Sequence, residues 1–227
     1  FDGRLPDGPV LFGYSGGALG TVSTPARGVV GSVVMDGNGD YVALPALGHD
    51  FSQGFSIDAW VRYDALLNYS RIVDLGTGPG GDNILLANKG TSNALCLNVV
   101  GTGGLGEFVI NGALDVGPWM HIAATVDAQG NARMYKNGSL IGTGRVNVPR
   151  AGISRNQSFL GKSNWATDST MDGALANVRL WTRPLSAGEV MDYAKNTISV
   201  TATVPGLVGF WRLADGKGSV AVDASRY

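Results

Sequence analysis

Apolar and polar residues alternate along two segments of the chain. In Phe55–Tyr63 every second residue is apolar, and in Trp119–Asp127 the same alternation begins at Met120. This period of two predicts half-buried antiparallel strands. The predicted core faces are Phe55, Ile57, Ala59, Val61 and Tyr63 in the first strand and Met120, Ile122, Ala124 and Val126 in the second; Ser56, Asp58, Trp60 and Arg62 fall on the outer face of the first.

A tight hairpin is predicted directly after the second strand. Asn137–Gly138 stands between Asn131–Lys136 and Ser139–Gly142, and Asn-Gly is the pair that two-residue type I′ hairpins favour. Further short strands are expected at Val29–Met35, Tyr41–Leu44, Ile84–Ala87, Phe108–Ile110, Leu175–Trp181 and Leu207–Leu213. Many short strands at this spacing are typical of a β-sandwich.

One segment predicts a helix. Ser186 and Glu189 match a capping box, in which the hydroxyl accepts from the third helical N–H and the carboxylate accepts from the Ser186 N–H. We expect one short helix near 186–195 and little other helix.

The composition supports an all-β fold. The chain has 227 residues and 35 glycines, about twice the usual glycine share of roughly 7%. Glycine suits tight turns and weakens helices. The one cysteine, Cys96, stands in an apolar run and is expected to pack as a small buried hydrophobe.

Charge and hydropathy exclude two classes of partner. The net charge is −1, charged residues make up 15%, and Lys and Arg form no block, so we expect no nucleic-acid binding. Because no apolar run approaches the roughly 18 residues of a membrane helix, we expect no membrane insertion. The chain begins at Phe1, and we expect it to be a processed part of a longer protein.

Several segments together resemble, in order, the laminin G-like jelly-roll domains of the concanavalin A-like lectin/glucanase superfamily. They are Met35–Val42, Phe55–Tyr63, Gly117–Ala123, Met134–Gly142, Phe159–Ser163, Met171–Trp181 and Arg183–Glu189. The resemblance covers residues 35–195 and implies an all-β, two-sheet antiparallel jelly-roll sandwich. We expect a single domain over 1–227, in which 206–225 is a closing strand or the start of a following repeat.

Carboxylates of the kind that glucanases of this fold use are scarce. The chain has only two glutamates, Glu107 and Glu189, which cannot form the Glu-x-Asp-x-x-Glu strand of those enzymes. A catalytic triad would need His49, which we expect to be solvated in a loop, or His121, which we expect to be a hydrogen-bonded structural residue. We therefore predict no enzyme; a glycan-active enzyme with paired aspartates is the alternative.

Calcium is the cofactor that the aspartates indicate. Relatives of the fold bind Ca²⁺ through comparable loops, and this ion takes six to eight oxygen ligands. The candidate metal ligands are Asp36, Asp40, Asp172 and Asp223. The alternative is that Asp36 and Asp172 only cap turns.

A saccharide site would combine exposed aromatic rings with polar side chains. The candidates are Asn164, Trp165 and Asp168 in one loop and Tyr69 in another; the alternative for Trp165 is that it folds onto the edge of the core. Asn68, Asn137 and Asn156 begin Asn-x-Ser sequences and are candidate glycosylation sites.

We therefore predict a secreted or cell-surface recognition or adhesion module. Its expected partner is a glycan or an extracellular protein, or neighbouring domains of the same parent chain or filament. The alternative function is a structural assembly unit of a surface filament or extracellular matrix, which large exposed apolar patches would favour.

Overall fold

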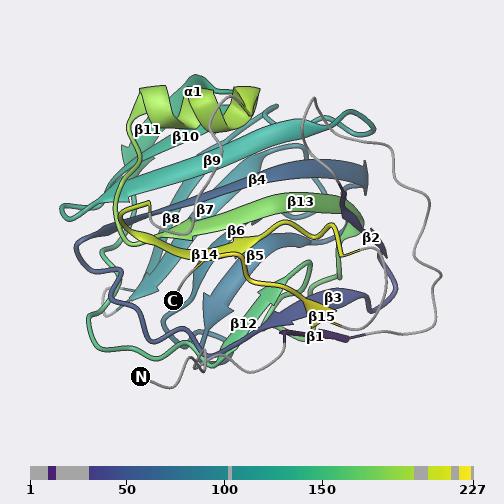
Figure 1. Cartoon of the computed structure of the whole chain (residues 1–227), viewed down its shortest axis with the longest axis horizontal. Coiled ribbons are helices and arrows are strands. Elements are labelled where there is room, and N and C mark those ends of the chain that lie inside the picture. Colours follow the sequence, from purple (N-terminus) through teal and green to yellow (C-terminus); the bar gives the residue numbers. More distant parts are fainter. Residues whose placement is uncertain (1–9, 14–30, 102–103, 197–203, 216–219, 226–227) are drawn as a thin grey trace.

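Two antiparallel sheets lie face to face (Figure 1). The computed structural model describes residues 10–13, 31–101, 104–196, 204–215 and 220–225. In these residues strands dominate and one helix is present. The predicted all-β, two-sheet jelly-roll sandwich is confirmed.

Eight strands of the described residues form the first sheet, in the spatial order β15-β1-β3-β12-β5-β6-β7-β8. They are β1 (Val10–Gly13), β3 (Tyr41–Leu44), β5 (Arg71–Gly76), β6 (Ile84–Asn88), β7 (Leu95–Gly101), β8 (Gly104–Ile110), β12 (Gln157–Leu160) and β15 (Val220–Ala221). Because β12 lies between β3 and β5, the turn that follows β12 comes close to the loop that precedes β5.

The second sheet has the order β11-β10-β9-β4-β13-β14. Its strands are β4 (Gly54–Ala65), β9 (Met120–Asp127), β10 (Asn131–Lys136), β11 (Ser139–Arg145), β13 (Asp172–Trp181) and β14 (Leu207–Trp211). A further strand, β2 (Val33–Asp36), pairs with the first half of β13, while β14 pairs with its second half. The segment that begins at 206 thus pairs within this sandwich.

The core lies between the sheets. Phe55, Ile57 and Val61 of β4 and Leu86 and Leu97 of the first sheet belong to one buried cluster. Burying each such side chain contributes about 1.5–3 kcal/mol relative to exposure. The core faces predicted for β4 and β9 both lie in this cluster.

The outer face of β4 is not solvated as its pattern predicted. Ser56 and Asp58 are almost fully buried, and Trp60 is 7% exposed. One reason is a second layer on this sheet: the helix α1 (Ala187–Lys195) packs Val190 and Tyr193 against its outer side in a separate apolar cluster (Figure 1). Trp60 lies in another small cluster, with Ala176 and Trp119. The prediction of half burial was therefore wrong for this strand.

The predicted helix start and hairpin are both present. Ser186 caps α1 and forms the capping box with Glu189. Asn137 and Gly138 have φ of 52° and 82°, the left-handed pair that a type I′ turn requires, and Lys136 pairs with Ser139 across that turn. The strand predicted at Val29–Met35 appears as β2, and its residues 29 and 30 lie outside the described residues.

Candidate functional site

The Arg71 guanidinium lies over the rings of both Tyr69 and Trp165. The Arg71 guanidinium is 5.7 Å from the centre of the Tyr69 ring and 5.6 Å from the centre of the Trp165 ring. Both rings are partly exposed, whereas Arg71 is 4% exposed. Cations at this range of an aromatic face are attracted to it, so Arg71 holds two rings from separate loops in one place.

Hydrogen bonds from Arg71 fix both of these loops. Its Nη1 donates to the Tyr69 carbonyl at 2.7 Å, and its Nη2 lies 2.7 Å from Asp168 Oδ2. The Ser163 hydroxyl donates to the same Asp168 oxygen at 2.8 Å. The predicted ligand-binding residues Tyr69, Trp165 and Asp168 are thus assembled around an arginine that the sequence analysis did not select.

A buried carboxylate holds the fourth predicted residue, Asn164. Asp74 on β5 is fully buried and accepts from the Asn164 backbone N–H and Nδ2, both at 3.0 Å, and from Asn83 Nδ2 at 2.8 Å. Asp74 Oδ2 also lies 3.6 Å from Arg71 Nε. Asp74 therefore anchors the 163–168 turn, and with it Trp165, to the sheet.

This network leaves acceptor capacity beneath the surface. The amide oxygens of Asn83, Asn98 and Asn164 are shielded from solvent and have no hydrogen-bond partner among the residues that the structure describes. A buried acceptor without a partner costs about 1–3 kcal/mol. Asn83 and Asn164 both donate to Asp74, so two of these unused acceptors lie beside the carboxylate that anchors the turn of Trp165.

The same face of the sheet carries polar and aromatic groups on both sides of β5. On one side, Lys89 Nζ lies 2.5 Å from Glu107 Oε1 and 5.5 Å from the Tyr69 ring centre. On the other, Phe159 stands opposite Asp74 and meets Tyr41 edge to face at 5.6 Å. We call this face, from Tyr41 and Phe159 through Tyr69 and Trp165 to Lys89, the aromatic face.

Cys96 also lies at this side of β7. It is buried, and its Sγ is 3.4 Å from Glu107 Oε1. Burial first, and then the Glu107 charge, raise the pKa of the Cys96 thiol to about 12. A thiol with so high a pKa stays protonated, in agreement with the expected packing role.

Three of the four predicted calcium ligands lie near one end of β13. Asp36 stands directly opposite Asp172, and Asp40 Oδ2 accepts from the Asp36 N–H at 3.4 Å. Burial first, and then the charges of Asp64 and Asp36, raise the pKa of Asp172. These carboxylates therefore repel one another, which is a condition that a bound cation relieves.

The fourth, Asp223, lies elsewhere. It bridges to Trp211, which pairs with Val178 further along β13, and it accepts from Phe210 N and Ser225 N at 2.9 and 2.8 Å. Among the residues that the structure describes, no three Asp, Glu, His or Cys side chains are close enough to hold a metal. Calcium binding stays a prediction.

The candidate glycosylation sites differ in exposure. Asn137, at the hairpin tip, and Asn156, before β12, are exposed, although Asn137 Oδ1 accepts from His121 N at 2.9 Å. Asn68 is partly exposed and its Nδ2 lies 3.4 Å from the Thr167 carbonyl. Asn156 is therefore the site whose modification would disturb the fold least.

The other groups considered for catalysis have structural partners. His121 is fully buried, with Nε2 3.1 Å from Asp58 Oδ1. Glu189 closes the helix cap and pairs with Arg183 at 2.6 Å, and Glu107 pairs with Lys89. His49 is partly exposed in a loop. The two glutamates belong to different layers of the molecule.

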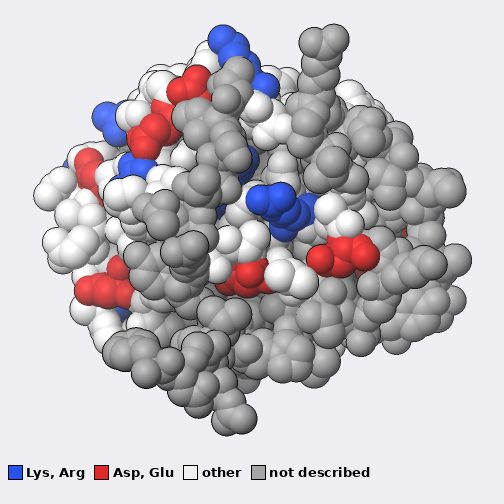
Figure 2. Space-filling model, viewed as in Figure 1, with Lys and Arg blue, Asp and Glu red and all other residues white. Residues whose placement is uncertain are grey.

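Neither a membrane-spanning helix nor a basic strip is seen in the part of the chain described. No helix there is long and apolar enough to cross a membrane. Basic and acidic side chains are interspersed on the described part of the face in Figure 2, whereas nucleic-acid-binding surfaces gather basic groups.

Solved structures share this fold at low sequence identity. A candidate carbohydrate-binding protein from Bacteroides ovatus is 19% identical with a TM-score of 0.59, over 80% of this chain and 52% of that chain. Domain 4 of AbnA, a GH43 extracellular arabinanase from Geobacillus stearothermophilus, in complex with arabinotriose, is 21% identical with a TM-score of 0.56, over 82% of each chain. The binding domain of botulinum neurotoxin serotype G is 20% identical with a TM-score of 0.52, over 74% of this chain and 47% of that chain.

At these identities the likeness shows the fold alone, and this chain spans about half the length of the first and third structures. No curated protein sequence matches the chain. A family model does match, over residues 36–191, which is most of the segment where the sequence resemblance was found. The chain belongs to the concanavalin A-like lectin/glucanases superfamily.

Proposed function

We propose that this chain is a non-catalytic, extracellular glycan-binding module that holds a saccharide on the aromatic face. The observation that carries the proposal is the convergence of Tyr69 and Trp165 on Arg71. Sugar rings present apolar C–H surfaces that stack on aromatic rings, and their hydroxyl groups need donors and acceptors beside that stack. Tyr69 and Trp165 offer the aromatic rings, and the polar side chains around them offer the hydrogen-bonding groups.

The arrangement is held in advance of binding. Trp165 is fixed through the Asn164 contacts to Asp74 and through the Ser163–Asp168 hydrogen bond, and Tyr69 is fixed through its carbonyl. A site whose side chains are already ordered loses less conformational entropy on binding. Affinity then depends mainly on the two rings.

The comparisons support a saccharide more than other ligands. One structure of the same fold contains arabinotriose, and another is a candidate carbohydrate-binding protein. The fold also occurs in a toxin's binding domain, and an extracellular protein ligand is the alternative for the same face. Function resides in the site rather than in the fold, so the choice between them rests on experiment.

The test is a glycan array, followed by calorimetry with the strongest array ligand and with arabinotriose. We expect Trp165→Ala to weaken binding roughly 10- to 100-fold, since an aromatic anchor in a binding site contributes about 1.4–2.8 kcal/mol. Trp119→Ala is the matched control, because Trp119 is also partly exposed but packs with Trp60 on the other sheet. Equal losses in the two variants would contradict the proposed location.

A second measurement tests the absence of catalysis. Prolonged incubation of the bound glycan with the protein should release no sugar. Release that an aspartate-to-asparagine substitution abolishes would show an enzyme instead. A blank array together with self-association in sedimentation would favour the structural assembly role.

A further inference from the structure

A shallow hollow of about 420 Å³ lies on β10 and β11, in the sheet opposite the aromatic face. Its floor is the paired backbone of Ala132 and Gly144. These residues face inward: Ala132 belongs to the core, and a Cβ on Gly144 would meet the Phe108 ring at 2.5 Å. The outer surface of the floor is therefore backbone without side chains.

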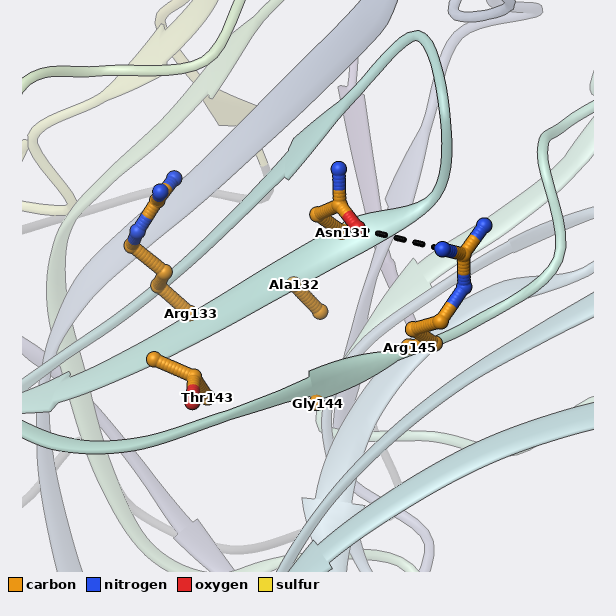
Figure 3. A pocket seen from close by; sticks show the side chains of 6 residues that line it. All are labelled: Asn131, Ala132, Arg133, Thr143, Gly144 and Arg145. Carbon is orange, nitrogen blue, oxygen red and sulfur yellow. Dashed lines mark hydrogen bonds between the residues drawn. The ribbon is translucent and has the colours of Figure 1, made fainter.

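Polar side chains surround this floor at four corners (Figure 3). Asn131 stands opposite Arg145, and Arg133 stands opposite Thr143. The two arginines are thus diagonal neighbours on adjacent strands, and the strand positions that bear them are about 7–8 Å apart. Figure 3 shows them on opposite sides of the hollow.

Arg145 is held by hydrogen bonds within the fold, whereas the guanidinium of Arg133 is available to a ligand. Arg145 Nη2 donates to the Gln129 carbonyl at 2.8 Å, and its Nη1 donates to Asn131 Oδ1 at 3.4 Å. Arg133 is exposed, and within the described part of the chain it has neither a hydrogen bond nor an ion pair. Its planar fork of donors is therefore open to an oxyanion.

The neighbouring carboxylate is already engaged. Asp127 accepts from the N–H groups of Gln129 and Asn131 and from Asn131 Nδ2. Its pKa is lowered, first by the Asn131 hydrogen bond and also by the charge of Arg133. Two guanidinium charges and one committed carboxylate leave the hollow net positive.

We propose that this hollow binds the sulfate group of an acidic saccharide between Arg133 and Arg145, with Thr143 and Asn131 as further polar contacts. A sulfate offers oxygens on several sides, and guanidinium groups recognise oxyanions with paired donors. The rim carries four polar side chains that can hydrogen-bond to the hydroxyl groups of a sugar, which favours a saccharide over an acidic peptide. This site is independent of the aromatic face, so either proposal can fail alone.

The experiment measures binding of the intact chain to dextran sulfate at low ionic strength, with unsulfated dextran, inorganic sulfate and poly-glutamate as separate probes. We expect dextran sulfate to bind and dextran not to bind. Arg133→Gln and Arg145→Gln should each weaken binding roughly tenfold, and added salt should weaken it further. Competition by inorganic sulfate alone would show that the hollow recognises the group itself.

Arg212→Gln is the matched control, because Arg212 is exposed and lies outside the hollow, over the Phe210 ring. It removes the same charge and should leave binding unchanged. An equal loss in this variant would reduce the effect to overall charge and overturn the site. The proposal is also overturned if dextran sulfate does not bind, or if poly-glutamate binds more tightly through the same two arginines.

Discussion

Asp58 is the residue whose replacement tests the buried polar layer of the fold. Its fully buried carboxylate accepts from Arg179 Nε at 2.8 Å, from Trp181 Nε1 at 2.9 Å, and lies 3.1 Å from His121 Nε2. Burial alone would raise the pKa of Asp58, but the charge of Arg179 and the hydrogen bonds of His121 and Trp181 outweigh it and hold the pKa below its ordinary value. The folded protein therefore stabilises the ionised form of the Asp58 carboxyl group.

Asp58→Asn keeps the shape of the side chain and removes its charge. Arg179, which is 1% exposed, is then a buried cation without a counter-ion, and breaking such a pair costs about 3–5 kcal/mol. At about 2–4 °C per kcal/mol for a chain of this length, the melting temperature should fall by about 6–20 °C. Asp115→Asn is the control: its side chain is 52% exposed beside Lys136, and such pairs contribute about 0–1 kcal/mol.

The assay is urea unfolding of the wild type, of these two variants, of Arg179→Met, and of a variant that combines Asp58→Asn with Arg179→Met. The double variant should recover part of the loss, because it removes the uncompensated charge as well. A loss below about 1 kcal/mol for Asp58→Asn, or a double variant less stable than the sum of the single effects, would refute the reasoning.

Three further predictions concern pH, backbone strain and calcium. Hydrogen bonding from Arg183 first, and then from Ser186, lowers the pKa of Glu189 from 4.5 to about 2. The native state therefore binds a proton at Glu189 less readily than the unfolded chain does. About 1–2 kcal/mol of folding stability, after discounting for partial exposure, should be present above pH 4.5 and lost as the pH falls towards 2. Unfolding followed against pH checks this, and an equal dependence in Glu189→Gln would contradict it. Gly173→Ala should lower the free energy of unfolding in urea by at least about 2 kcal/mol, because a Cβ there would lie 2.0 Å from the Arg62 carbonyl oxygen. Gly112 also has a positive φ but lies in open space, so Gly112→Ala should lower it by only about 1–2 kcal/mol. Calcium at the Asp36–Asp172 pair should raise the melting temperature relative to chelator, and no shift at saturating calcium, or a shift unchanged in Asp172→Asn, would exclude it.

The core-facing residues of the periodic strands could be predicted from the sequence because their apolar residues recur at every second position. In Phe55–Tyr63 the five residues of the predicted core face all lie in the core, whereas the burial of the opposite face comes from other parts of the fold. By contrast, β5 was missed: Arg71 and Asp74 interrupt its apolar run, and the register shifts between Arg71 and Val73. A charged residue buried in an apolar strand breaks the alternation, and here it marks the site.

The candidate site was predictable in its members and not in its assembly. Tyr69 and Trp165 could be selected as aromatic residues in polar loops. Their meeting depends on β12 pairing with β5, a contact between segments far apart in the chain that local periodicity does not encode. The signal that could have identified Arg71 is its place directly after Tyr69 at the start of an apolar run.

The central claim is that the aromatic face binds a saccharide, and the most direct test is an NMR titration of the labelled chain with its strongest array ligand. We expect the Trp165 indole, the Tyr69 ring and the Arg71 guanidinium signals to shift together and to saturate with the same dissociation constant. The Trp119 and Trp181 indoles, on the opposite sheet, should stay in place. Saturable shifts confined to that opposite sheet, with Trp165 unchanged, would contradict the account.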